Sequence, residues 1–167
     1  MTTDLIEDHD SLHFAAKTGN YDEVKRLIDS AADVNQKDGS NRTALHLTSD
    51  LNIVRLLLEN GADPNAKANG DSTPLHAAVI NNSDIGVFEL LFHCGADLNS
   101  RDDPYGSTPL HYAAWLGKPN QAKILIELGA DLRVRNNTEA RTPLIDALNQ
   151  GHDELIRILI EAENIIL

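Results

Sequence analysis

Small and branched apolar residues come in short clusters along the chain, and each cluster has the spacing of one face of a helix. In the best-defined stretch, Leu110, Ala113 and Ala114 form one such face. A second, longer face follows at residues 122–128, where Ala, Ile and Leu recur at helical spacing. Gly117 separates the two clusters. The pattern predicts two short helices joined by a turn.

The ends of these predicted helices carry residues suited to their positions. Thr108 suits an N-cap, because its hydroxyl can accept a hydrogen bond from an amide of the first turn. Pro109 follows where a missing N–H removes no intrahelical bond. Pro119 stands at the start of the second helix and Gly129 after its end. The turn-rich residues 131–141 predict a hairpin-like finger that leads into the next unit.

This arrangement repeats along the chain. A phrase similar to Thr-Pro-Leu-His recurs at spacings of 33, 30, 35 and 34 residues, at 10–13, 43–46, 73–76, 108–111 and 142–145. A second phrase, similar to Gly-Ala-Asp-Leu-Asn, runs in phase with it at 31–35, 61–65, 95–99 and 129–133. Two phrases locked together about 33 residues apart are typical of a stacked-repeat solenoid.

We therefore predict an all-α solenoid of about five helix-turn-helix-hairpin units. The units form a single domain over residues 1–167, with approximate bounds of 10–42, 43–72, 73–107, 108–141 and 142–167. Neither helix of a unit is long enough to be stable alone in water, so we expect neighbouring units to stabilise one another. The repeats leave no room for a separate catalytic domain.

With these paired phrases, residues 10–162 resemble the ankyrin-repeat family. The resemblance implies an L-shaped solenoid in which the finger tips and the inner short helices line a concave face. It also implies that this face binds another protein.

The second unit is shorter than the others. Residues 47–54 lack the Ala-Ala pair and the glycine that separate the two helices elsewhere. We expect a first helix cut by about one turn, with Asp50 or Asn52 capping the next helix. The shortening is either a tolerated deletion or a functional dent in the concave wall. A similarly trimmed second repeat occurs in small ankyrin-class inhibitors of cyclin-dependent kinases, to which this unit is similar in that respect only.

The chain is acidic, with a net charge of −12 and a pI of about 4.8. This charge repels phosphate and disfavours nucleic acid as a partner. It either keeps an elongated surface soluble or favours partners with a basic patch. Cys94 is the only cysteine, so no intrachain disulfide is possible. We expect Cys94 to be buried as a small apolar residue.

We expect a monomer in the cytoplasm, and also in the nucleus, that does not contact membranes. Residues 1–10 lack the basic start and apolar run of a secretory signal, and no stretch approaches the length of a membrane span. The apolar ending at 165–167 suggests either a docked tail or a chain cut from something longer.

Repeated polar residues offer candidate chemistry. Packed helices are too far apart to bring the histidines of the phrase onto one metal ion, so we expect them to bond neighbouring finger backbone. These are His13, His46, His76 and His111. We expect Asn35, Asn65 and Asn99 to satisfy finger backbone groups as well. The family resemblance implies that these three asparagines can be hydroxylated by an intracellular asparaginyl hydroxylase. No cofactor is predicted.

The candidate partner-binding residues centre on Trp115, the only tryptophan. By helical phase it points away from the packed alanines, toward the inner surface, with Ile80 and Asn149 at the matching places of adjacent units. Aromatic residues and arginines dominate binding hot spots. The remaining candidates are Tyr105, Tyr112, Arg101, Arg135 and Arg141. Trp115 and Tyr112 could instead simply fill space between helices.

The sequence therefore predicts a non-enzymatic protein-interaction module that binds a protein or peptide on its concave face. One alternative is an inhibitor that docks on and blocks an enzyme such as a protein kinase, which the short second unit suggests. Another is one arm of a larger scaffold or effector protein. No nucleophile motif, phosphate loop or acid–base pair is present to support catalysis.

Overall fold

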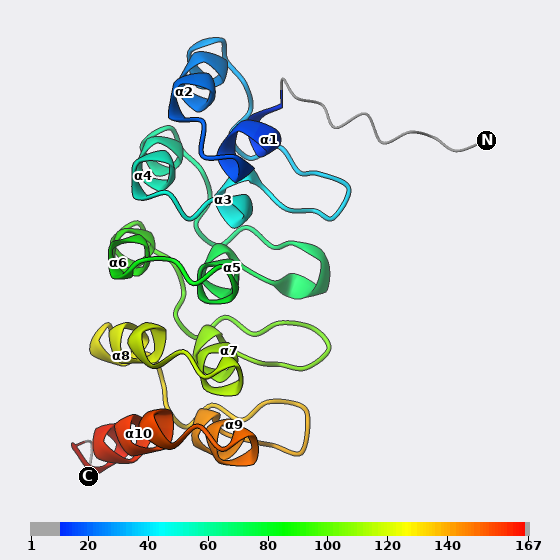
Figure 1. Cartoon of the computed structure of the whole chain (residues 1–167). Helices are drawn as coiled ribbons and strands as arrows, with labels where there is room; N and C mark the ends of the chain where they lie inside the picture. Colours follow the sequence, from blue (N-terminus) through cyan, green and yellow to red (C-terminus); the bar gives the residue numbers. More distant parts are fainter. Residues whose placement is uncertain (1–10, 166–167) are drawn as a thin grey trace.

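Two columns of stacked helices run the length of the molecule in this computed structural model, which describes residues 11–165 (Figure 1). The inner column contains α1 (Leu12–Lys17), α3 (Ala44–Leu47), α5 (Pro74–Ile80), α7 (Pro109–Leu116) and α9 (Pro143–Gln150). The outer column contains α2 (Tyr21–Asp29), α4 (Leu51–Glu59), α6 (Ile85–His93), α8 (Pro119–Glu127) and α10 (Asp153–Ile165). The predicted all-α solenoid of paired helices is confirmed.

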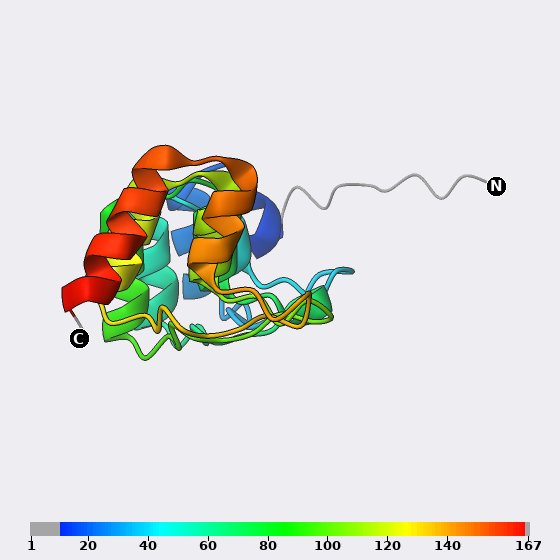
Figure 2. The same cartoon turned by 90° about the horizontal axis from the view of Figure 1, so that it is seen from below.

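Fingers connect each outer helix to the next inner helix, and all project to the same side of the stack (Figure 2). The first to fourth fingers are residues 33–42, 63–72, 97–107 and 131–141. Backbone hydrogen bonds close each finger, such as the one from the Ala68 N–H to the Ser72 carbonyl at 2.9 Å. The described residues contain no β-strand, and the second finger holds a short 3-10 helix, η1 (Asn69–Asp71). The predicted hairpins are therefore turned loops rather than strand pairs.

The helices begin and end at the residues that the sequence predicted as caps. Thr108 is the N-cap of α7, and its Oγ1 accepts from the His111 N–H at 3.4 Å. Pro109 occupies the first turn, and Gly117 ends the helix in the left-handed conformation at φ 65°. That conformation is accessible to glycine without a steric penalty, which explains the sharp turn into α8.

The second unit has the short inner helix that its sequence predicts. The helix α3 spans only four residues and ends at Leu47. Asp50 then caps α4, because its Oδ1 accepts from the Asn52 N–H at 2.9 Å and the Ile53 N–H at 3.0 Å. The deletion therefore removes one turn of the inner column without disturbing the outer column.

Leucines at equivalent positions form the core between the two columns. Leu75 and Leu110 lie fully buried in successive inner helices. Leu57, Leu91 and Leu125 are fully buried in successive outer helices. Each repeat thus buries the same side chains against its neighbours, which is the source of stability in a solenoid.

Two expectations turn out differently or fall outside the structure. Cys94 is exposed, not buried, and is the C-cap residue that follows the last turn of α6. The residues 1–10 and 166–167, on which the signal and tail expectations rest, lie outside the described residues. Within the described part of the chain, no helix has both the length and the apolar character needed to cross a membrane.

Replacing Leu110 by alanine tests the repeated core. Loss of this fully buried side chain should lower the free energy of unfolding by about 2–5 kcal/mol, because it removes apolar contacts and leaves a cavity. Urea unfolding followed by circular dichroism measures the change. The matched control is Leu148→Ala in α9, where the side chain is 53% exposed and the expected change is within about 0.5 kcal/mol. Equal losses in the two variants would contradict this core assignment.

Candidate partner-binding groove

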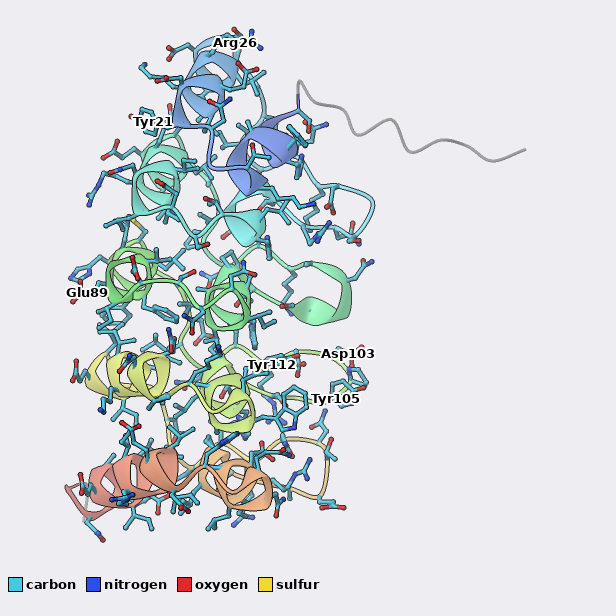
Figure 3. All side chains as sticks on the ribbon, viewed as in Figure 1. Tyr21, Arg26, Glu89, Asp103, Tyr105 and Tyr112 are labelled. Atoms are coloured by element: carbon cyan, nitrogen blue, oxygen red, sulfur yellow. The ribbon has the colours of Figure 1, made fainter. Side chains whose placement is uncertain are left out.

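A groove of about 400 Å³ opens between the inner helices α7 and α9 and the third and fourth fingers. Figure 3 shows Tyr105 and Tyr112 in this region, whereas Tyr21 lies beside the outer helices. The groove is lined by Tyr105, Ser107, His111, Tyr112, Trp115, Asn136, Thr138, Arg141 and Asp146. Four of the eight residues predicted from sequence to contact a partner are among them, namely Tyr105, Tyr112, Trp115 and Arg141.

Histidines hold the inner helices α3, α5 and α7 to the finger that follows each of them. The Nε2 of His46 lies 3.1 Å from the Ser72 carbonyl, that of His76 lies 3.1 Å from the Ser107 carbonyl, and that of His111 lies 3.0 Å from the Arg141 carbonyl. We call these three contacts the histidine ladder. The structure confirms the predicted bonding role of these side chains.

The histidine ladder requires the neutral imidazole. In the repeat that contains α7, the Thr108 N–H donates to Nδ1 of His111 at 3.2 Å, so Nδ1 carries no proton and Nε2–H is the donor. Burial lowers the pKa of His111, and the bond from its ring to the Arg141 carbonyl only partly opposes this effect. Burial likewise lowers the pKa of His46 and of His76.

Asparagines form a second ladder at the base of the fingers. The Asn35 side chain accepts from the Asp63 N–H at 2.8 Å and donates to the Gly61 carbonyl at 2.9 Å. Asn65 makes the equivalent pair of bonds one repeat later, and Asn99 accepts from the Asp131 N–H at 2.9 Å. The predicted role of these side chains in satisfying finger backbone is confirmed, while their hydroxylation stays a prediction.

Backbone bonds join neighbouring finger tips. The Asp103 N–H donates to the Gly70 carbonyl at 2.8 Å, and the Asn137 N–H donates to the Tyr105 carbonyl at 2.7 Å. The Asn137 side chain also donates to the Pro104 carbonyl at 2.9 Å. The two fingers that wall the groove are therefore fastened to each other at the tip.

A half-buried tyrosine and a buried aspartate support the floor of the groove. The Tyr112 hydroxyl donates to Oδ2 of Asp102 at 2.8 Å, and the Ser107 N–H donates to Oδ1 of the same carboxylate. The Tyr112 ring meets the edge of His76 at a centroid distance of 5.4 Å. Burial, and then the bond to Asp102, raises the pKa of the Tyr112 hydroxyl well above its ordinary value, so it stays a donor.

Arg141 and Asp146 form an ion pair at the far wall. Nε of Arg141 lies 3.0 Å from Oδ1 of Asp146, in an orientation that makes the contact an ion pair rather than a well-aligned hydrogen bond. Burial raises the pKa of Asp146, and the nearby Arg141 charge opposes the effect. Asp146 is only 5% exposed, whereas the Arg141 side chain is 27% exposed, so the carboxylate is the shielded member of the pair.

The other predicted contact residues lie outside the groove. Ile80 is half exposed on α5, and Asn149 is exposed near the end of α9. Arg101 donates to Oδ1 of Asn137 at 2.8 Å, and Arg135 donates to the Ala140 carbonyl at 3.0 Å. Both arginines are thus engaged in stabilising the fingers.

Sequence reasoning missed several lining residues. His111 had been given a structural role alone, and Asn136 and Asp146 were not selected. Asp146 occupies in the fifth unit the position that Tyr112 occupies in the fourth, counted from the Thr-Pro-Leu phrase. Alignment of the units on that phrase would have placed it in the groove. No cluster of His, Cys, Asp or Glu within residues 11–165 could hold a metal ion.

Comparison with known proteins identifies the architecture. A family model described as ankyrin repeats (3 copies) matches residues 12–102 and 75–166. The chain belongs to the ankyrin-repeat family. Ankyrin repeats are protein-interaction modules, and the fingers and inner helices described above are the ankyrin concave face.

Several Notch proteins contain similar ankyrin repeats. The chain is 36% identical over 118 residues to neurogenic locus notch homolog protein 1 of Danio rerio, a match that covers 69% of this chain and 5% of that protein. It is 34% identical over 107 residues to neurogenic locus notch homolog protein 2 of Homo sapiens, covering 62% of this chain and 4% of that protein. The chain thus spans only a small part of these relatives.

Acid should weaken this ankyrin fold through the histidine ladder. Because burial lowers the pKa of His46, His76 and His111 in the folded state, the unfolded chain binds protons first as the pH falls. The stability contributed by neutral histidine is full above about pH 6.5 and is lost as the pH falls below that value, by at most about 1.4 kcal/mol per pH unit for each ring.

Urea unfolding at a series of pH values below about 6.5 measures this loss in the free energy of unfolding. The His76→Gln variant lacks one titrating ring and should show a shallower fall in the free energy of unfolding than the original chain. Identical pH dependence in the two proteins would contradict the role given to the ladder.

Proposed function

We propose that the chain is a non-enzymatic interaction module that binds a protein or peptide in the groove between α7, α9 and the third and fourth fingers. The observation that carries the proposal is the exposure of large aromatic side chains at this groove. Trp115 is 54% exposed and Tyr105 is 59% exposed. Both are residue types that dominate binding hot spots. An exposed aromatic pair beside a groove is a typical anchor for a partner.

The surroundings of the groove favour binding without large rearrangement. The histidine ladder fixes the start of α5 and of α7 against the next finger, and the Asn137–Tyr105 backbone bond joins the two walls. Residues that are already held in place lose little conformational entropy when a partner binds. Binding energy is therefore available for the contact itself.

A second candidate function is inhibition of an enzyme by docking. The observation that favours it is α3, which has four residues where the neighbouring inner helices α1 and α5 have six and seven. Insertion of three residues after Ser49 would restore the usual repeat length and should abolish inhibition of any enzyme that the chain blocks. Unchanged inhibition by the lengthened chain would remove this candidate.

We also place the protein in the cytoplasm or nucleus. An exposed and unpaired Cys94 is suited to a reducing compartment.

Affinity capture from a native lysate tests the main proposal. Trp115→Ala should weaken binding of the captured protein by more than about 1 kcal/mol, or roughly fivefold, because the anchor is lost. The matched control is Tyr21→Ala, which removes an exposed aromatic side chain from the outer column. Circular dichroism confirms that both variants are folded. A partner that binds the Trp115 variant as tightly as the original chain would refute the assignment of the groove.

A further inference from the structure

We infer that the groove accepts an extended peptide segment through one large, uncharged, apolar side chain. The inference rests on the function proposed above and specifies the chemistry of the guest. It distinguishes this guest from a basic peptide, which the acidic composition of the whole chain would otherwise suggest.

The charged groups that line the groove already neutralise each other. Arg141 and Asp146 form the ion pair at 3.0 Å, and the Asp146 carboxylate is 5% exposed. A cationic guest would have to compete with Arg141 for this carboxylate, and an anionic guest would have to compete with Asp146 for the guanidinium. Removing one member of a buried pair leaves an uncompensated charge, which is strongly unfavourable.

Two of the charged groups next to the groove are engaged as well. The Asp102 carboxylate accepts from the Tyr112 hydroxyl and the Ser107 N–H. Arg101 donates to the Asn137 side chain on the adjacent finger. A charged guest side chain would therefore displace contacts that hold the groove together.

The acidic excess of the chain lies mainly elsewhere. The outer helix α10 carries one arginine against four acidic residues, Asp153, Glu154, Glu161 and Glu163. The charges on the two fingers that wall the groove nearly balance, with four basic residues against five acidic ones: Arg101, Arg133, Arg135 and Arg141 against Asp97, Asp102, Asp103, Asp131 and Glu139. Attraction of a basic partner would thus act most strongly at α10, away from the groove.

Apolar surface is what the groove offers to a guest. The aromatic faces of Trp115 and Tyr105 are more than half exposed, and Tyr112 lies between them and the helix core. A volume of about 400 Å³ can hold a large side chain together with adjoining backbone. Transfer of a Leu, Phe or Trp side chain from water to this surface is favourable without any counter-charge.

Two hydrogen-bond donors indicate a peptide rather than a purely hydrocarbon guest. Within residues 11–165, neither the Tyr105 hydroxyl nor the Trp115 indole N–H has a hydrogen-bond partner. Both groups need a partner when a guest buries them. The backbone carbonyls that flank the anchor of an extended peptide can accept from both donors.

Selection from a displayed library of random peptides, with the full chain immobilised, tests the inference. We expect the enriched peptides to share a Trp, Phe or Leu and to show no excess of Lys or Arg. A fluorescent copy of one such peptide then gives affinities by anisotropy. Alanine at the shared apolar position should weaken binding by more than about tenfold, and raising NaCl from about 50 to 500 mM should change it by less than about threefold.

Protein variants separate this inference from the proposed function. Trp115→Ala and Tyr105→Ala should each weaken peptide binding by more than about fivefold, while Tyr21→Ala leaves it unchanged. Tyr105 lies on a finger and not on a helix, so Tyr105→Ala provides the test if Trp115→Ala does not fold. Peptides that need Trp115 but are rich in Lys or Arg, or are released by salt, would overturn the inference and leave the proposed function intact.

The remaining outcomes are also decisive. Failure to enrich any peptide that depends on Trp115 or Tyr105 would overturn the peptide guest, while capture of a folded protein could still support the groove. Equal binding by the original chain and by both aromatic variants would refute the groove assignment itself.

Discussion

Contacts between neighbouring repeats hold this molecule together, because no inner helix is long enough to be stable alone. The inner helices have between four and eight residues, well short of the length at which a helix persists in water. Buried leucines at equivalent positions supply the apolar part of each contact. The histidine ladder, the asparagine ladder and the bonds between finger tips supply the polar part. The concave face is a consequence of these contacts, since they fix the fingers relative to the helices.

The same contacts give the groove its chemistry. Arg101 on the third finger bonds Asn137 on the fourth, and Arg141 on the fourth finger pairs with Asp146 on α9, so these charges are already engaged. Trp115 and Tyr105 take no part in the fastening through their side chains and stay exposed. A surface built in this way is rigid and neutral with an aromatic lining. It suits recognition of an apolar anchor, while the most acidic helix, α10, lies in the outer column.

The sequence predicted the elements and their stacking more fully than the groove. Periodicity and caps placed α7 and α8 within about a residue, and the missing turn of α3 follows from the absent Ala-Ala pair and glycine. The role of His76 and His111 could be predicted because the same side chain recurs at the same position. The convergence of Tyr112 with Asp102, and of Arg141 with Asp146, could not be predicted in this way, since it depends on how one finger bends toward its helix. Cys94 shows a similar limit, because its exposure depends on the last turn of α6.

Native-state hydrogen exchange at the finger tips tests most directly whether contacts between repeats hold the concave face in place. The amides of Asp103 and Asn137 donate to carbonyls of the preceding fingers at 2.8 and 2.7 Å, although they lie far from the helical core. Our account predicts that both amides exchange much more slowly than in an unstructured peptide of the same sequence, because exchange requires the fingers to separate. Exchange at the unstructured rate would show that the fingers move independently and would contradict the account.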